Sequence, residues 1–355
     1  MSRSISFIYF TNPSDSSGIE LKMNNFYKAF LDKGFAATKS PIDVSLGILP
    51  STKSLFETIK NNTDYYFVRY NNSRNIVFLF FFILLKFNKN KLIIEVPTPI
   101  TNNVDEIKLS SANLFRKLYM YITTFCLGPI PLSLGNLVLQ YANESSYFGH
   151  LAKNQTLLIG NGIDTNSYLH FTGNPDRFKS FDELQIVIIA NLASWHGVDL
   201  LLNALKDVEF KYKVHIVGNG VEKHNLMELS EKLALSKYVK FYGKLDRVEY
   251  LKILEKSHLG IGSLNWDIIN VKFSSALKLR EYVSVGLPIL FSSFDPDLSE
   301  NEYCYQVQCN VESIKKNLLK AYSEIRNFDQ KVQLRLAKNT LDMPVKVDTI
   351  LAILS

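Results

Sequence analysis

The chain has 355 residues, of which 46% are hydrophobic and 21% are charged, and its formal net charge is +6. This composition is that of a globular protein and excludes a disordered or fibrous one, and the length allows two ordinary domains. The positive charge is too diffuse to indicate nucleic-acid binding. Because the three cysteines have no metal-binding spacing and the N-terminus has no signal-peptide cleavage region, we expect a cytoplasmic protein with reduced thiols.

Short β-rich runs alternate with helical patterns along the chain, which predicts parallel sheets in an α/β fold. In the first half we expect strands at 4–10, 65–70, 91–96, 136–142 and 156–160. Between the first two strands, Ile19, Met23, Phe26 and Phe30 fall on one face of a predicted helix that ends at Gly34. In the second half we expect strands at 184–190, 213–218, 239–243, 259–264 and 288–293.

Two segments of the first half, 76–85 and 114–127, are candidates for contact with a membrane. Residues 76–85 are all apolar, but a membrane span needs about twice that length. They indicate a buried helix against a sheet or, because Lys86, Lys89 and Lys91 follow, a helix that faces an anionic membrane. Residues 114–127 have a helical period and also mix basic with aromatic residues, so they are a second candidate for membrane contact.

The polar residues 168–183 contain Gly, Pro and Asp without a sustained period, which predicts a linker. We therefore expect an N-terminal domain at 1–167, a C-terminal domain at 184–340 and a final segment, 341–355, that packs back on the first domain. The predicted architecture is two doubly wound, Rossmann-like domains that face each other across a cleft. Ligands of such sheets bind at the carboxyl ends of the strands.

Several loops after predicted strands carry candidate binding residues. Gly18 precedes the first helix, where a backbone without a side chain can approach a ligand, although an ordinary strand–helix turn is the favoured explanation. In the second domain the candidates for binding phosphate oxygens are Asn191 and His196 after the first strand, Gly218 after the second, and Gly243 and Lys244 after the third. His196 has an alternative interpretation as a helix-start residue that bonds to the backbone.

The stretch SSALKLREYVSVGLPIL, at 274–290, predicts a polar helix that leads into a buried strand. Ser274 or Ser275 is a suitable N-cap, so Leu277 and Lys278 begin a helix whose free amides can hold an anion. Glu281 lies on the same face as Lys278 and can accept two ribose hydroxyls, whereas the alternative is an intrahelical Lys–Glu pair on a solvated face. This pattern predicts a nucleoside diphosphate site.

With these motifs on view, the sequence resembles the retaining GT-B glycosyltransferases of family 4, especially the branch of capsule and lipopolysaccharide (O-antigen) synthesis. The resemblance depends on SSGIELKMNNFYKAFLDKGF, IIEVPTP, LLIGNGIDTNSY, NLASWHGVDLLLNAL, VHIVGNG, VKFYGKL and SSALKLREYVSVGLPIL, in this order. It implies that the second domain holds a nucleotide-sugar donor, that the first domain holds the acceptor, and that the sugar is transferred with retention and without a bound metal.

The resemblance also assigns roles to single positions. Glu281 matches the second glutamate of the paired-glutamate motif, but Phe273 stands at the position of the first. The arginine and lysine of the family fall at Asn191 and His196. The histidine of the family falls near Pro97, which leaves Glu95 as the nearest ionisable candidate for a catalytic contact. Lys278 is the candidate that stabilises the departing diphosphate. The motif Asp295-Pro296-Asp297 is interpreted as a structural turn rather than a metal site.

The implied partners are a UDP- or GDP-sugar donor and a lipid-linked oligosaccharide acceptor, with peripheral contact at the inner face of the cytoplasmic membrane. Neither a cofactor nor nucleic acid is expected. Two alternatives stay open. The departures at Phe273, Asn191 and the missing histidine fit a catalytically degenerate GT-B subunit that binds or activates a partner. A nucleotide-sugar epimerase is less favoured, because the first domain offers His150 as its only histidine beside Asp15, Glu20 and Glu95.

Overall fold

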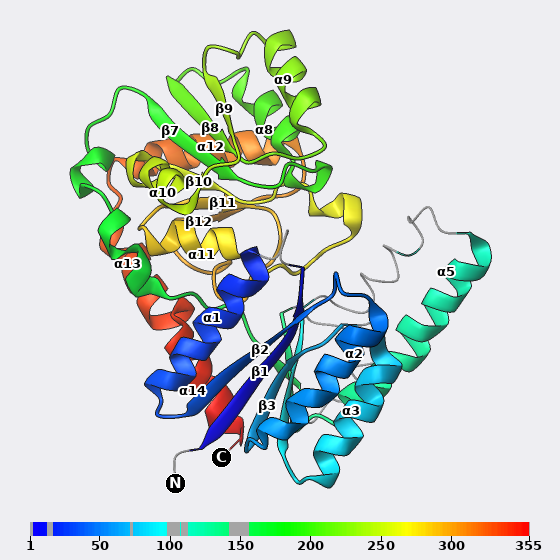
Figure 1. The fold of residues 1–355 in the computed structure, drawn as a ribbon. Helices are drawn as coiled ribbons and strands as arrows, with labels where there is room; N and C mark the ends of the chain where they lie inside the picture. The colour runs from blue at the N-terminus through cyan, green and yellow to red at the C-terminus, as the bar shows by residue number, and fades with distance from the viewer. Residues whose placement is uncertain are drawn as a thin grey trace. The chain divides into compact units, whose positions relative to one another are not determined.

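The computed structural model describes residues 3–12, 17–71, 74–97, 107, 113–141 and 156–354 of the chain. The chain forms two compact units, of which the first comprises Met1–Gly162 with Met343–Ser355 and the second comprises Ile163–Asp342. Each unit contains a six-stranded parallel sheet covered by helices (Figure 1). The predicted α/β fold with two doubly wound, Rossmann-like sheets is confirmed.

The sheet of the first unit has the strand order β2-β1-β3-β4-β5-β6. Its elements are β1 (Ser4–Thr11), α1 (Ser17–Asp32), β2 (Ala36–Asp43), α2 (Ile48–Glu57), η1 (Thr58–Asn61), β3 (Tyr65–Arg69), α3 (Asn75–Phe87), β4 (Lys91–Val96), α5 (Leu114–Tyr121), η3 (Ile122–Leu127), α6 (Pro129–Leu132), β5 (Leu137–Gln140), β6 (Thr156–Leu158) and α14 (Met343–Leu354). Sequence analysis did not predict β2, because half of its residues are polar and one is Pro41. As an edge strand paired only with β1, it tolerates both features.

Alternate residues of the strands pack on opposite faces of this sheet. Phe7 of β1 lies in the core beneath α1 and α14, whereas Ile8 lies in the core beneath α3. The buried face of α3 contributes Phe78, Phe81 and Phe82 to the second of these cores. The run at 76–85 is therefore a helix with one face buried against a sheet.

The sheet of the second unit has the order β12-β11-β10-β7-β8-β9. Its elements are η5 (Thr165–Phe171), η6 (Pro175–Phe178), β7 (Leu184–Ile189), η7 (Ser194–His196), α8 (Val198–Leu205), β8 (Tyr212–Val217), α9 (Lys223–Lys232), β9 (Val239–Gly243), α10 (Arg247–Lys256), β10 (Leu259–Ile261), η8 (Trp266–Ile269), α11 (Leu277–Ser284), β11 (Ile289–Phe291), β12 (Cys304–Gln306), α12 (Val311–Ile325), α13 (Gln330–Leu336) and η9 (Ala337–Leu341). The strand order reverses between β7 and β10, and ligands of doubly wound sheets bind at such a reversal.

The boundary between the units differs from the predicted linker at 168–183. The chain leaves the first unit after Gly162 and returns to it at Met343. Tyr168 and Phe178 are fully buried in the core of the second unit, so the segment belongs to that unit in spite of its polar composition. The C-terminal helix α14 lies in the first unit and packs on α1, where Lys33 forms an ion pair with Asp348.

None of the helices in the described ranges is both long and apolar enough to cross a bilayer.

Candidate functional site

Three loops of the second unit converge at the carboxyl edge of its sheet, beside the reversal of strand order. The Gly218 N–H donates to the carbonyl of Gly243 (2.7 Å), and the Leu192 N–H donates to the carbonyl of Asn219 (2.6 Å). Gly218 has a φ of 123°, and a Cβ there would lie 1.9 Å from the Ala190 carbonyl oxygen. Gly218 therefore serves the packing of loop against loop, and its contact with phosphate stays a prediction.

His196, after β7, is held by its own loop. Its Nδ1 accepts a hydrogen bond from the Ala193 N–H (3.1 Å), and its carbonyl accepts one from the Leu264 N–H (3.0 Å). Burial, with a smaller effect from the charge of Lys278, lowers the pKa of His196 to about 3. The imidazole is therefore neutral at physiological pH. Because Nδ1 accepts, the proton lies on Nε2, which can donate to a ligand.

The ammonium nitrogen of Lys278, in the first turn of α11, is buried and has no hydrogen-bond partner among the described residues. Burial lowers the pKa of Lys278 to about 7. A buried amine without a partner is costly, and an anion beside it would restore the charged form. The effect of Lys278 on the pKa of His196 places the two side chains in the same region.

Glu281, one turn further along α11, lies in a buried tyrosine cluster. Its Oε1 accepts hydrogen bonds from Tyr168 Oη (2.8 Å) and Tyr250 Oη (2.9 Å). Burial raises the pKa of Glu281, and the two tyrosine hydrogen bonds oppose this rise. The guanidinium of Arg247 lies 4.7 Å from the centre of the Tyr168 ring. The surface Lys278–Glu281 pair considered from the sequence is wrong, because Glu281 is buried and the Nζ of Lys278 bonds to neither of its oxygens.

The predicted N-caps Ser274 and Ser275 do not cap α11. The helix begins at Leu277, its N-cap is Ala276, and no side chain of the N-cap accepts a hydrogen bond from the first turn. Ser274 instead donates its N–H to the carbonyl of Phe294 (3.0 Å). The N-cap residue Ala276 thus offers no side-chain acceptor to the first turn of α11, and an anion could take that place.

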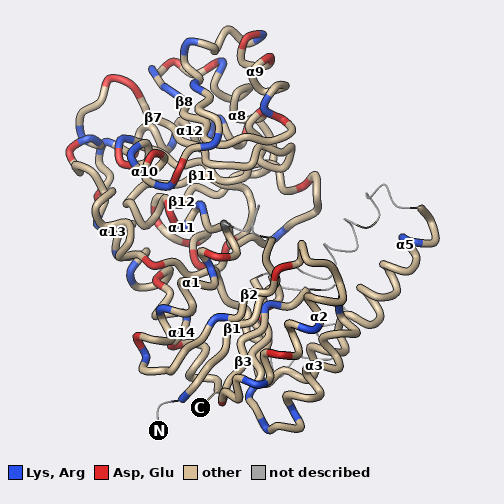
Figure 2. Tube along the Cα trace, in the orientation of Figure 1, with Lys and Arg blue, Asp and Glu red and all other residues tan. Residues whose placement is uncertain are grey.

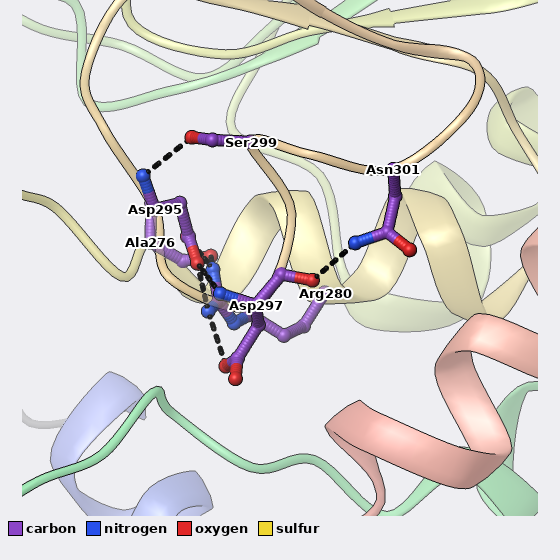
Figure 3. Close-up of polar contacts among 6 residues, drawn as sticks. All are labelled: Ala276, Arg280, Asp295, Asp297, Ser299 and Asn301. Atoms are coloured by element: carbon purple, nitrogen blue, oxygen red, sulfur yellow. Dashed lines mark hydrogen bonds and ion pairs between the residues drawn. The ribbon is translucent and has the colours of Figure 1, made fainter.

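A buried ion cluster fixes α11 to the loop after β11 (Figure 3). The guanidinium of Arg280 is fully buried and bonds to both carboxylate oxygens of Asp295, with 2.8 Å between Nη2 and Oδ1. Its Nη2 also donates to Asp297 Oδ2 (3.0 Å), while the Asp295 N–H donates to Ser299 Oγ (2.8 Å). The structural interpretation of Asp-Pro-Asp is confirmed, and its cluster holds the helix that carries Lys278 and Glu281.

Phe273, which stands where the resemblance expects a glutamate, makes an aromatic contact. Its ring packs edge-on against Phe294, with 5.5 Å between the ring centres. Asn191 and Lys244 are both exposed at the same sheet edge. The described residues contain no group of three or more His, Cys, Asp or Glu side chains that could hold a metal ion.

In the first unit, Glu95 lies inside a charged cluster rather than at the surface. Both of its carboxylate oxygens accept hydrogen bonds from Arg69 Nη1 (2.8 Å each), and Lys22 forms an ion pair with Oε1 (2.5 Å). Burial would raise the pKa of Glu95, but the charges of Arg69 and Lys22 lower it overall. Glu95 is fully buried, so it contacts a ligand through the partly exposed Arg69 at most.

Gly18 at the start of α1 is exposed, and a Cβ there would meet no atom within 4 Å. Packing against the described residues therefore does not require a glycine at position 18. Sequence analysis missed Lys22, Arg69, Tyr168, Arg247 and Tyr250. These residues are distant in sequence from Glu95 and Glu281, the carboxylates they support, so no local pattern assigns them this role.

Comparison with known proteins supports the architecture. Residues 175–324, which make up most of the second unit, match the family described as Glycosyl transferases group 1. The O-antigen biosynthesis glycosyltransferase WclY of Escherichia coli is 34% identical over 122 residues, which are 33% of this chain and 34% of that protein. The chain thus matches about a third of the length of its curated relatives.

Two solved structures share the fold over nearly the full chain. One is HepE of Anabaena in complex with UDP and glucose (TM-score 0.69, 13% identity, 98% of this chain and 99% of that chain). The other is a sucrose-phosphate synthase from Thermosynechococcus elongatus (TM-score 0.70, 13% identity, 99% of each chain). The fold of the two units is therefore that of the GT-B glycosyltransferases.

Proposed function

We propose that this chain is a retaining glycosyltransferase whose second unit binds a UDP- or GDP-sugar. The observation that carries the proposal is the buried Nζ of Lys278, which has no partner among the residues that the structure describes and lies near the neutral imidazole of His196 at the reversal of strand order. The match of the second unit to Glycosyl transferases group 1 supports it. So does the UDP in the structure of HepE, a protein of the same fold.

In the proposed mechanism, these residues stabilise the diphosphate that leaves the donor sugar. An anion beside Lys278 raises the pKa of the amine, so that the ammonium counters the negative charge that develops in the transition state. His196 donates from Nε2, and the uncapped first turn of α11 offers backbone N–H groups. Glu281 Oε2, on the carboxylate whose Oε1 holds the two tyrosines, accepts a ribose hydroxyl. The bond from the anomeric carbon to the diphosphate breaks through an oxocarbenium-like transition state. An acceptor hydroxyl oxygen bonds to the same face of that carbon, so the configuration is retained, and the hydroxyl proton passes to the departing diphosphate.

The proposed acceptor is a lipid-linked oligosaccharide of surface polysaccharide synthesis, held by the first unit at the inner face of the cytoplasmic membrane. The likeness to an O-antigen biosynthesis glycosyltransferase supports this class of acceptor. The carboxyl edge of the first sheet offers Arg69, whose Nη1 is oriented by Glu95 and whose side chain is partly exposed. Arg69 is the proposed contact for an anionic or hydroxyl group of the acceptor.

A second candidate is a degenerate GT-B subunit that binds the nucleotide sugar without turning it over. The packing of Phe273 on Phe294, where the paired-glutamate motif would place a carboxylate toward the donor sugar, favours this alternative.

Release of nucleoside diphosphate from a panel of UDP- and GDP-sugars, with and without polyprenyl-diphosphate-linked oligosaccharides, separates the two candidates. Acceptor-dependent release that is lost in Lys278→Met but kept in the exposed control Lys252→Met supports the enzyme. Donor binding without release under every condition supports the degenerate subunit. If neither binding nor release occurs with any donor, both candidates are wrong.

A further inference from the structure

The helix α5 in the first unit exposes an apolar face. No residue of α5 is buried. The helix continues into η3, and five exposed apolar residues of α5 and the start of η3 lie on one side of it. Counted from the first of them, the others follow after one, four, five and eight positions. They are Leu114, Phe115, Leu118, Tyr119 and Ile122, with Phe115 84% exposed. Within the described residues nothing covers this face.

The helix α3 presents a second apolar stripe. The face opposite its buried phenylalanines exposes Ile76, Phe80, Leu84 and Phe87, the last of which is 80% exposed. α3 contacts η3, and Figure 1 shows α3 and α5 on the same side of the first sheet. The two stripes together are defined here as the α3–α5 surface. Isolated exposed apolar residues are common, but a set of nine on α3 and on the α5–η3 helix, which contacts α3 through η3, marks an interaction site.

The helices of the α3–α5 surface and the neighbouring α6 carry charges of one sign. The helices α3, α5, η3 and α6 contain Lys86, Arg116 and Lys117 and no Asp or Glu, and Lys89 follows α3 directly (Figure 2). A two-fold contact between copies of this chain would place these basic residues against their own kind. An anionic bilayer satisfies both features, because its headgroups attract the basic side chains while its acyl boundary accepts the apolar ones.

We propose that the α3–α5 surface docks onto an anionic membrane, with the α5–η3 helix lying in the plane of the lipid interface. This inference deepens the membrane contact of the proposed function by naming the surface that makes it. It requires no transmembrane segment, since apolar side chains on one face of a helix reach only into the headgroup and upper acyl region. Phe115 and Phe87 are the deepest proposed contacts.

Sedimentation with vesicles tests this proposal. The probes are vesicles of phosphatidylcholine alone and of phosphatidylcholine mixed with phosphatidylglycerol, at low and high salt. The wild-type chain is expected to bind the mixed vesicles and to bind less at high salt. The double variant Leu114→Ser with Phe115→Ser should lose at least about tenfold in partitioning, and Phe87→Ser should lose less. Val221→Ser in the second unit is the matched control, since Val221 is also 84% exposed.

Two further readouts make the outcome decisive. Because the substituted residues are exposed, their variants should keep the wild-type melting temperature, and their affinity for UDP should be unchanged. A wild type that ignores anionic vesicles, or a double variant that binds them like Val221→Ser, overturns the proposal. So does a lipid-free wild-type dimer by light scattering that the double variant converts to a monomer. Because nucleotide binding is measured separately from vesicle binding, a failure of the proposed donor site can be told apart from a failure of the proposed membrane contact.

Discussion

The charge of Lys278 helps to keep His196 neutral, although the two residues are far apart in sequence. Burial is the larger cause, and it acts on both side chains, so the free second unit holds a lysine of unusually low pKa beside an uncharged histidine. A bound diphosphate favours the charged form of Lys278. It leaves His196 neutral, because the Nδ1 of His196 accepts the hydrogen bond of the Ala193 N–H. Several measurable consequences follow from this pair and its neighbours.

Lys278→Met should stabilise the free protein, and most strongly at low pH. The folded pKa of Lys278 is about 7, below its unfolded value of about 10.5, so the unfolded state binds more protons between these values. The contribution of this lysine to stability therefore rises with pH from about 7 to about 10.5. The difference in melting temperature between variant and wild type should be largest below pH 7 and smallest near pH 10. A difference that does not change with pH would contradict the account.

Nucleotide binding should be linked to proton uptake. At pH 8 most Lys278 side chains of the free protein are neutral, and a bound diphosphate favours the charged form. Calorimetric titration with UDP in buffers of different ionisation enthalpy should show uptake approaching one proton per site at pH 8, and much less at pH 6. Lys278→Met should remove the uptake. Equal uptake in the variant would assign the proton to another group.

Glu281→Gln distinguishes the contribution of the ribose to nucleotide binding from that of the diphosphate. The amide oxygen of glutamine can still accept from Tyr168 and Tyr250, so the variant should fold with little change in melting temperature. Loss of a charged acceptor for a ribose hydroxyl should weaken UDP binding about tenfold to hundredfold, which corresponds to about 1.5–3 kcal/mol. Binding of inorganic diphosphate should not change. An equal loss for both ligands would mean that Glu281 acts through the shape of α11 instead.

The Arg280 cluster should be a large contributor to the stability of the second unit. Asp295→Asn removes the main counter-charge of a fully buried guanidinium, and breaking a buried ion pair in this way costs about 3–5 kcal/mol. Asp297→Asn is the matched control, because Asp297 is partly exposed and contributes a single bond to the guanidinium, so its cost should be about 1 kcal/mol. Denaturant unfolding measures both, and equal costs would contradict the assignment.

The sequence predicted the fold better than the site. Alternation of apolar strands with amphipathic helices was sufficient for two parallel sheets, and the misses were polar or short strands such as β2 and β12. Residues 168–183 were misread as a linker because their aromatic anchors, Tyr168 and Phe178, carry no period.

Within the candidate site, the sequence pointed to Lys278 and Glu281 because both lie in one motif at helical spacing. It could not reveal that Tyr168 bonds to Glu281, since 113 residues separate the two and only the fold brings them together. The sequence also could not show that Ser274 donates its N–H to the Phe294 carbonyl instead of capping α11. That contact depends on the position of the loop held by Arg280 and Asp295.

The most direct test of the account is the affinity of the chain for UDP and GDP, measured by calorimetry at pH 7 on wild type, Lys278→Met and Lys252→Met. We predict that one of the two nucleotides binds the wild type, that Lys278→Met binds it about tenfold to hundredfold more weakly, and that Lys252→Met matches the wild type. Equal binding by Lys278→Met and wild type, or no binding of either nucleotide, would contradict the donor site at α11.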